Sequence, residues 1–333
     1  MVSRTEVENM SIGEFLRNKI GLKVELRDLQ ALDSFSGETV GNTTFYKGLD
    51  ECVANIEDWM PIYFFPVAVE SGFHIGIHLR PLDVSAGRLA FMMAVDESQL
   101  IEVAVSLQHY IFRSLARQEG YVNETGPLSY FEQSVSVVKR ILGTDFYKPG
   151  RYGKFSEDDA NEVVSKVFGK APSDYHEAAM FEDDIHKKLA ILEEGIKAEP
   201  GCMKLYINAT ELYNELDNEN LAAQTLIKSL KCFHHTCYSS DLDDYYDTGR
   251  SLLEAVPDIF PDEARRDLTT TDEESRFKLI TTLYQNEQVA EATKMLCDMC
   301  HSFGDYNSVL NILRKHYSKL KWDWALALCD LRS

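Results

Sequence analysis

The feature that most constrains the fold is a recurring set of side chains in the second half of the chain. Four tyrosines are spaced by 33, 38 and 33 residues, namely Tyr213, Tyr246, Tyr284 and Tyr317. Each is followed after eight or nine residues by an alanine, namely Ala222, Ala255, Ala292 and Ala325. Four residues after these alanines stand Leu226, Ile259, Leu296 and Cys329. A single helical hairpin cannot bury its own apolar face, so this repetition predicts an array of packed hairpins.

The stretch Met203–Ser229 shows the pattern most clearly. Side chains at intervals of three or four lie on one face of a helix, here Tyr206, Ala209, Thr210 and Tyr213. A polar turn over 214–220 follows, and a second helical face then carries Ala222, Leu226 and Ser229. Small residues inside the contact and larger ones outside it indicate a helical hairpin.

Two further stretches fit this repetition. Leu192, Gly195, Ile196 and Pro200 resemble the closing half of an earlier unit. The charged stretch 261–274 accounts for the longer spacing before Tyr284 as an insertion. The whole pattern resembles the tetratricopeptide (TPR) repeat in a divergent form that lacks the consensus Trp and most of the Gly residues. An irregular helical bundle is the alternative.

The first half of the chain has a different residue pattern, with three candidate strands close together in the sequence. They are the apolar run 62–69, the strictly alternating run 73–79, and 89–95, which Asp96 closes. We expect helices over 5–20, 23–33 and 45–56 before them, a long helix from near Ser98 after them, and another over 130–142. This order predicts a small α+β domain.

The same order resembles the SUKH superfamily over residues 50–115. The matching features are the Phe65-Pro66 pair, Gly72, Asp96, and the helix start Ala104-Val105-Ser106-Leu107. Many bacterial members of that superfamily are immunity proteins that neutralise polymorphic toxins, often nucleases. The resemblance therefore implies an inhibitor that occludes a toxin. An unrelated small α+β domain with the same ordering is the alternative.

The best linker candidate lies between these halves, where Pro149-Gly150 and Tyr152-Gly153 interrupt the chain. After it, Ser156 to Asp159 read as the cap of a helix that extends to Phe168. We therefore expect an α+β domain over 1–145, a connecting segment over 146–180 and an all-α helical-hairpin, TPR-like array over 181–333.

The formal net charge is −20, and both halves are acidic. An acidic chain repels nucleic-acid phosphates and anionic membranes and attracts basic partners. Solubility alone is the other explanation of this charge. The N-terminal residues lack the apolar segment of a signal peptide, and no run of eighteen apolar residues occurs. Seven cysteines, an odd number, suggest reduced buried thiols. Together these features predict a cytoplasmic protein.

Two cysteine motifs raise the question of a metal or a cofactor. Cys297-Asp298-Met299-Cys300-His301 matches the haem attachment pattern, and Cys232–Cys237 encloses two adjacent histidines. The first lies on an expected helix whose apolar face uses Leu296 and Met299, and the second lacks a matching ligand pair elsewhere. Packed thiols are the simpler interpretation, so we expect neither a metal site nor a cofactor.

The expected partner-binding residues are Asp241, Asp243, Asp244, Tyr245 and Asp247. The run is no calcium loop, because Tyr246 and Leu252 occupy the positions that need Gly and Glu. Acidic groups steer a basic partner, and aromatic rings supply contact energy. A solvated inter-helix loop is the alternative. We expect a non-enzymatic inhibitor of a basic protein; a peptide-binding adaptor ranks second, and an enzyme with a carboxylate site in the N-terminal half ranks third.

Overall fold

The computed structural model describes residues 10–22, 26–56, 60, 64–78, 90–95, 99–232, 239–270, 272–299 and 306–331. The chain forms two compact units. Unit 1 comprises Met1–Ala94, Glu102–Ala171 and Asp323–Ser333, and unit 2 comprises Val95–Ile101 and Pro172–Trp322. The predicted connecting segment 146–180 is therefore divided, since the boundary falls between Ala171 and Pro172.

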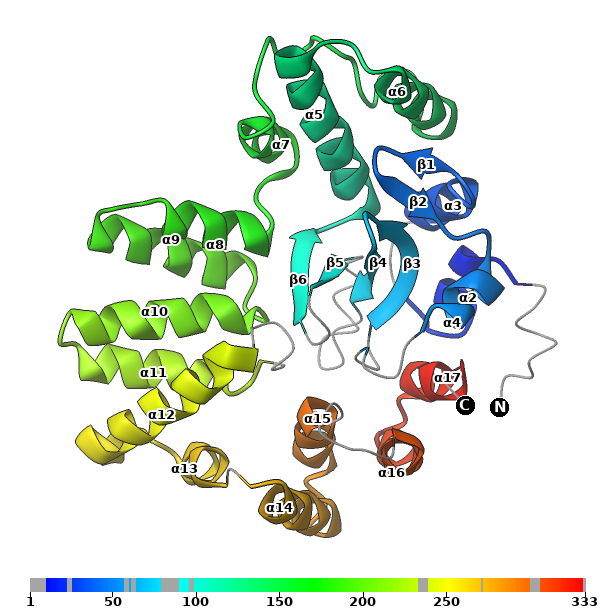
Figure 1. Cartoon of the computed structure of the whole chain (residues 1–333). Coiled ribbons are helices and arrows are strands. Elements are labelled where there is room, and N and C mark those ends of the chain that lie inside the picture. Colours follow the sequence, from blue (N-terminus) through cyan, green and yellow to red (C-terminus); the bar gives the residue numbers. More distant parts are fainter. Residues whose placement is uncertain are drawn as a thin grey trace. The chain divides into compact units, whose positions relative to one another are not determined.

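A sheet of six strands in sequential order lies in the N-terminal part of the chain (Figure 1). Its strands are β1 (Thr39–Val40), β2 (Thr43–Phe45), β3 (Phe64–Glu70), β4 (Phe73–His78), β5 (Ala90–Val95) and β6 (Gln99–Ala104). The pairs from β1 to β5 are antiparallel. Thr43 pairs with Glu70, and a bulge lies between Pro66 and Ala68. Pro66 lacks the N–H that a regular ladder requires, which accounts for an irregularity at this point.

Among the described residues, six helices between Ile12 and Phe168 belong to unit 1. They are α2 (Ile12–Asn18), α3 (Leu26–Ser34), α4 (Leu49–Ala54), α5 (Leu107–Thr125), α6 (Ser129–Leu142) and α7 (Ala160–Phe168). Phe15 of α2 stacks on Phe65 of β3 with ring centroids 5.6 Å apart. Phe35 stacks on Phe45 of β2 at 5.2 Å. These buried rings join the helices to the sheet and form its core.

The predicted linker belongs to the core of unit 1. Phe112 of α5 contacts four aromatic rings, those of Phe146, Tyr147, Tyr152 and Phe168. Glu119 accepts hydrogen bonds from the Tyr147 hydroxyl and the Gly150 amide, each at 2.5 Å. Residues after α6 are thus held against α5 by packing and by a buried carboxylate.

The structure corrects the prediction for residues 98–106. The expected long helix does not begin near Ser98, because 99–104 form strand β6 and α5 begins only at Leu107. Ser106 caps that helix by accepting a hydrogen bond from the His109 amide at 3.1 Å. Glu102 of β6 is buried, and its Oε1 lies 2.8 Å from Nδ1 of His78 on β4, so this charged residue is an interior group.

In the described part of unit 2, every regular element after Ile101 is a helix. Its helices are α8 (Pro172–Met180), α9 (Ile185–Ala198), α10 (Met203–Glu215), α11 (Glu219–Ser229), α12 (Ser239–Ala255), α13 (Asp262–Thr269), α14 (Glu273–Gln285), α15 (Val289–Met299) and α16 (Tyr306–Leu320), with a short 3-10 helix, η3 (Pro257–Ile259). Consecutive helices from α8 to α13 contact one another, as do those from α14 to α16. Figure 1 shows α8 to α11 as neighbouring antiparallel rods. The last helix, α17 (Asp323–Leu331), belongs to unit 1.

Three of the four tyrosine positions end a helix in the same way. A residue with positive φ follows each of them, namely Asp217, Glu287 and Lys321. The next amide bonds back to the carbonyl of Tyr213, Leu283 or Tyr317 at 2.9 to 3.0 Å. This geometry closes a helix at its C-terminus. Ala222 and Ala292 then lie fully buried on the second helices, α11 and α15.

The remaining tyrosine position, Tyr246, is different. Tyr246 and Ala255 lie on one helix, α12, so no turn separates them as the repeat requires. The stretch 261–274, predicted to be an insertion, contains helix α13, which packs on α12. The half-unit predicted before Met203 is a complete hairpin of α8 and α9. An α+β N-terminal part followed by a helical part is therefore present, with one repeat out of register.

No helix in the described part of the chain combines the length and the apolar character needed to cross a membrane.

Candidate functional site

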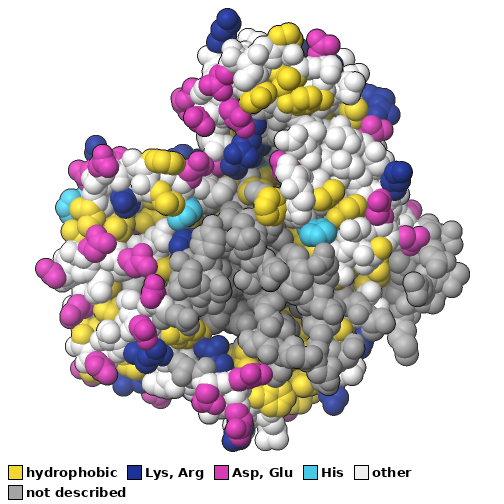
Figure 2. Space-filling model, in the orientation of Figure 1, with side chains coloured by type: hydrophobic (Ala, Val, Ile, Leu, Met, Phe, Trp, Pro, Cys, Tyr) yellow, Lys and Arg dark blue, Asp and Glu magenta, His cyan; other side chains and the backbone are white. Residues whose placement is uncertain are grey.

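The predicted partner-binding residues lie on α12. The side chains of Asp244 and Asp247 are exposed, and Arg250 donates to Asp247. Glu254 extends the exposed acidic face by two turns. Asp241 and Asp243 are part of the same helix, but their side chains lie outside the described residues. Figure 2 shows acidic side chains spread over unit 2 rather than gathered in one patch.

Tyr245 does not fit the predicted role of a surface anchor. Its side chain is 3% exposed and belongs to a core cluster with Leu226, Leu252 and Leu268. The hydroxyl lies 2.7 Å from Ser229 Oγ. The neighbouring Tyr246 ring is covered by the Arg276 guanidinium, 4.9 Å from the ring centroid. The tyrosine that follows a run of acids therefore points inward, because α12 needs it to pack on α11.

A second candidate surface lies at the turn between α8 and α9. Phe181 is 83% exposed and Met180 is 66% exposed, which is unusual for two adjacent large apolar side chains. Exposed Glu177 precedes them, and Glu182, Asp183 and Asp184 follow. An apolar centre with a charged rim is the arrangement of a protein-binding surface.

Hydrogen bonds hold this turn in place. Asp184 caps α9 by accepting from the amides of His186 and Lys187 at 2.9 and 3.1 Å. The Lys187 amide bond, with a smaller part from His186, lowers the pKa of the Asp184 carboxyl. Glu182 in turn accepts from the Asp184 amide at 3.0 Å. The Asp184 carboxylate therefore stays ionised at neutral pH. Phe181 projects from a turn that these hydrogen bonds hold in place.

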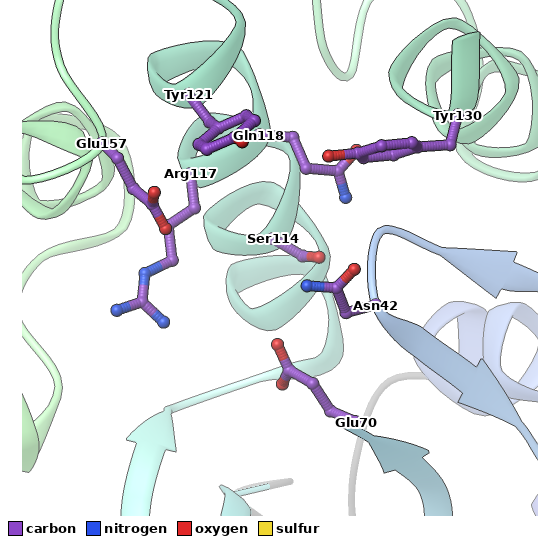
Figure 3. Close-up of a pocket in the computed structure, with 8 residues that line it drawn as sticks. All are labelled: Asn42, Glu70, Ser114, Arg117, Gln118, Tyr121, Tyr130 and Glu157. Carbon is purple, nitrogen blue, oxygen red and sulfur yellow. The ribbon is translucent and has the colours of Figure 1, made fainter. Parts of the chain in front are cut away.

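Unit 1 contains a polar pocket of about 280 Å³ (Figure 3). Its lining comes from the β1–β2 turn, the end of β3, one face of α5, the start of α6 and the cap region of α7. The lining residues are Asn42, Glu70, Ser114, Arg117, Gln118, Tyr121, Tyr130 and Glu157. Figure 3 shows Glu70 and Asn42 reaching toward the middle, while Gln118 lies between the rings of Tyr121 and Tyr130.

Gly41 allows the β1–β2 turn to approach α5. Its φ is +66°, in the left-handed region that favours glycine. A Cβ added there would lie 1.9 Å from Gln118 Nε2 and 2.8 Å from Ser114 Oγ. The Gly41 amide donates to Ser134 Oγ of α6 at 2.9 Å. The turn is thereby fixed between two helices, which places Asn42 at the pocket.

Glu70 is oriented by a buried hydroxyl pair behind the pocket. The Tyr110 hydroxyl donates to Glu70 Oε2 at 2.7 Å and lies 2.7 Å from Thr43 Oγ1. Because Tyr110 gives its one proton to Glu70, Thr43 is the donor to Tyr110. Burial, and then the charge of Glu70, raise the pKa of Tyr110 well above its usual value. Tyr110 therefore remains a donor and keeps the carboxylate turned toward the pocket.

Gln118 is the unusual member of the lining. Its side chain is 9% exposed, and neither amide atom has a hydrogen-bond partner among the described residues. A buried polar group without a partner costs about 1–3 kcal/mol. Helix α5 thus carries an amide at position 118 that makes no hydrogen bond within the described part of the chain.

The cysteine motifs fall partly outside the described residues. Cys237, Cys300 and His301 are not described, whereas Cys232 and Cys297 are buried. The Cys297 Sγ lies 3.4 Å from the Tyr317 hydroxyl. Burial raises the pKa of the Cys52 thiol far above its usual value. Within the described part of the chain, no three His, Cys, Asp or Glu side chains converge to hold a metal ion.

The chain was also compared with known proteins. No model of a known protein family matches it, and no functionally curated protein matches its sequence.

Sequence reasoning missed both the Met180–Phe181 pair and the pocket. The pair had a readable signal, since two large apolar residues stand directly before three acids and a helix cap. The pocket had none. Its members come from positions 42 to 157, and only the pairing of β2 with β3 and the packing of α5 bring them together.

Proposed function

We propose that this chain is a non-enzymatic protein-binding protein that holds a basic partner through unit 2. The observation that carries the proposal is Phe181, 83% exposed beside Met180 in an ordered, acidic turn. Aromatic and Met side chains dominate the centres of protein interfaces, where a few of them supply most of the binding energy. The surrounding acids select a basic surface and speed its approach.

The acidic face of α12 supports the same partner charge. Asp244, Asp247 and Glu254 are exposed there, and the net charge of the chain is −20. Within this proposal, the resemblance of residues 50–115 to the SUKH superfamily favours an immunity-type inhibitor. Its partner would be a basic toxin domain such as a nuclease, because nucleases carry basic surfaces for their substrate. Inhibition would follow from occlusion.

A second candidate is a TPR-type adaptor that binds a peptide segment. It is favoured by the repeated helix closures at Asp217, Glu287 and Lys321 and by the pocket in unit 1, which would take a separate ligand. Salt distinguishes the two candidates. Binding of a basic globular partner weakens steeply as salt rises, because attraction between exposed charges is largely screened beyond the Debye length, which is about 8 Å at physiological ionic strength and shortens with added salt.

An enzyme remains the third hypothesis. In unit 1 the pocket holds two carboxylates, Glu70 and Glu157. Activity that survives removal of residues 180–333 would favour this hypothesis over both binding proposals.

The test is affinity capture from an extract of the native cells with three forms of the full chain. These are the unaltered chain, Phe181→Ser, and Val167→Ser as the matched control, since Val167 is a 43% exposed apolar residue on α7 of unit 1. We expect at least one basic protein to be captured by the unaltered chain and the control but lost with Phe181→Ser. The proposal would be refuted if all captured proteins were acidic. It would also be refuted if Phe181→Ser captured the same basic proteins as the unaltered chain.

A further inference from the structure

The polar pocket of unit 1 that Gln118 lines takes no part in the proposed protein-binding surface. Its volume of about 280 Å³ corresponds to roughly nine water molecules at their liquid volume of about 30 Å³ each. Pockets for drug-sized ligands begin at about 300 Å³. The occupant is therefore a small molecule rather than a segment of a protein chain.

The charges of the lining select a neutral occupant. The lining contains two carboxylates, Glu70 and Glu157, and one guanidinium, that of Arg117. An anion such as a phosphate would meet the two carboxylates, and a cation would meet Arg117. Phosphorylated and strongly basic small molecules are both disfavoured.

The hydrogen-bonding groups select hydroxyls. The carboxylate of Glu70 only accepts and the guanidinium of Arg117 only donates, whereas the side chains of Asn42, Ser114 and Gln118 do both. A hydroxyl group also does both, so it is complementary to every one of these partners. A molecule with several neighbouring hydroxyls would use them together.

Gln118 and the two tyrosines, Tyr121 and Tyr130, further restrict the chemical class of the ligand. The Gln118 amide is buried against Gly41 and its oxygen and nitrogen both lack partners among the described residues. A ligand with adjacent hydroxyls would satisfy both atoms once the amide turns toward the pocket. The rings of Tyr121 and Tyr130, 40% and 41% exposed, lie on either side of this amide (Figure 3). The negative face of such a ring attracts the C–H edge of a saturated ring.

We propose that the pocket lined by Gln118, Glu70 and the two tyrosines binds a small neutral polyhydroxylated ring compound of monosaccharide size. Glu70, oriented by Tyr110 and Thr43, accepts from one hydroxyl of the ligand. Gln118 bonds a neighbouring hydroxyl pair, and Tyr130 packs against the ring. The site is independent of the turn at Phe181, so either proposal can fail without the other.

The test is isothermal titration calorimetry of the full chain with four neutral probes, D-glucose, D-galactose, N-acetyl-D-glucosamine and myo-inositol. At least one should bind one molecule per chain with a dissociation constant of about 1 mM or below. Gln118→Leu and Tyr130→Ala should each weaken that binding by about tenfold or more. Gln108→Leu is the matched control on the same helix, because Gln108 bonds Asp28 and does not line the pocket; its affinity should stay unchanged.

Charged probes complete the test. Glucose 6-phosphate and arginine should bind at least about tenfold more weakly than the best neutral probe, for the electrostatic reasons above. The proposal is overturned if none of the four neutral probes binds in the millimolar range. It is equally overturned if a charged probe binds best, or if Gln118→Leu and Tyr130→Ala, with circular dichroism unchanged, leave the affinity of the neutral probe intact.

Discussion

His316 is a buried titratable side chain at the contact between α14, α15 and α16. It is 3% exposed, its ring stacks on Tyr284 with centroids 4.5 Å apart, and Nδ1 lies 3.1 Å from Thr293 Oγ1. Because the Thr293 hydroxyl donates to the Val289 carbonyl, His316 is the donor to Thr293, which assigns its proton to Nδ1. Burial, followed by the positive charge of Lys319, lowers the pKa of His316 from 6.5 to about 4.

This histidine should make stability depend on pH. Between about pH 6.5 and about pH 4 the unfolded chain binds a proton at His316 that the folded chain excludes. Its contribution to stability is therefore complete above pH 6.5 and declines as the pH falls through that window. We expect the unaltered chain to lose about 2 kcal/mol more than His316→Gln between about pH 7 and about pH 4.5. Denaturant unfolding of both proteins at several pH values measures this difference. Equal losses of unfolding free energy in the two proteins would contradict a lowered pKa of His316.

A second prediction for a single residue concerns the effect of Gln118 on stability. Replacing a buried amide that lacks a partner with an apolar side chain of similar size removes its desolvation cost. Gln118→Leu should therefore raise the free energy of unfolding by about 1 kcal/mol, even though it removes the proposed ligand contact. Gln108→Leu breaks the hydrogen bond to Asp28, 2.9 Å long, and should instead lower the free energy of unfolding. A destabilised Gln118→Leu would show that the amide has a structural partner.

Single residues were predicted unevenly from the sequence. Asp244 and Asp247 are exposed as expected, because acidic side chains on a helix that carries one apolar stripe face solvent. Tyr245 was predicted to be an exposed binding residue, but it is buried. Its neighbours on α11 decide which of the two adjacent tyrosines is buried. Phe181 was overlooked because an apolar residue in a turn has no periodicity to mark it.

At the scale of single elements, the closure of α10 depends on a residue in the left-handed region. Asp217 has φ 54°, and the following Asn218 amide bonds to the Tyr213 carbonyl at 2.9 Å. Glycine adopts this conformation without strain, whereas a β-branched residue does not. Asp217→Val should lower the free energy of unfolding by about 1–2 kcal/mol, and Asp217→Gly should leave it unchanged or raise it by about 0.5 kcal/mol. Equal effects of the two substitutions, measured by thermal or denaturant unfolding, would exclude this turn geometry.

Elements were predictable where local pattern and tertiary packing agree. The hairpin of α10 and α11, helix α6 and strands β3 to β5 follow their apolar periodicity. Strand β6 was missed because its interior holds Glu102, whose partner His78 lies far away in the sequence. Strands β1 and β2 were missed because they are short and Phe45 fits a helical spacing with Leu49 equally well. Non-local pairing decided each of these cases.

At the scale of the whole molecule, the pattern of the sequence separates two units but misplaces their boundary. Residues 146–171 contain turn signals, yet Tyr147 and Phe168 pack on α5 and join unit 1. The candidate pocket depends on this assignment, since Glu157 reaches it from the same segment. Its existence follows from the packing of distant elements, which a local pattern does not record.

The charge of the molecule predicts how it associates with a basic partner. Replacing Asp241, Asp243, Asp244 and Asp247 together with lysines reverses the charge at the start of α12. With the captured partner, this variant should associate about tenfold more slowly at low salt, and the difference should disappear as salt is added. Stopped-flow or surface-based kinetics at several salt concentrations provide the measurement. Association rates that match those of the unaltered chain at low salt would remove α12 from the binding surface.

The most direct test of the central claim is the affinity of the captured partner for the Phe181→Ser variant. A large aromatic at the centre of an interface supplies about 2 kcal/mol or more of binding free energy. Titration calorimetry should therefore show Phe181→Ser binding the partner about thirtyfold more weakly, with Val167→Ser unchanged. An affinity of Phe181→Ser equal to that of the unaltered chain would contradict the account.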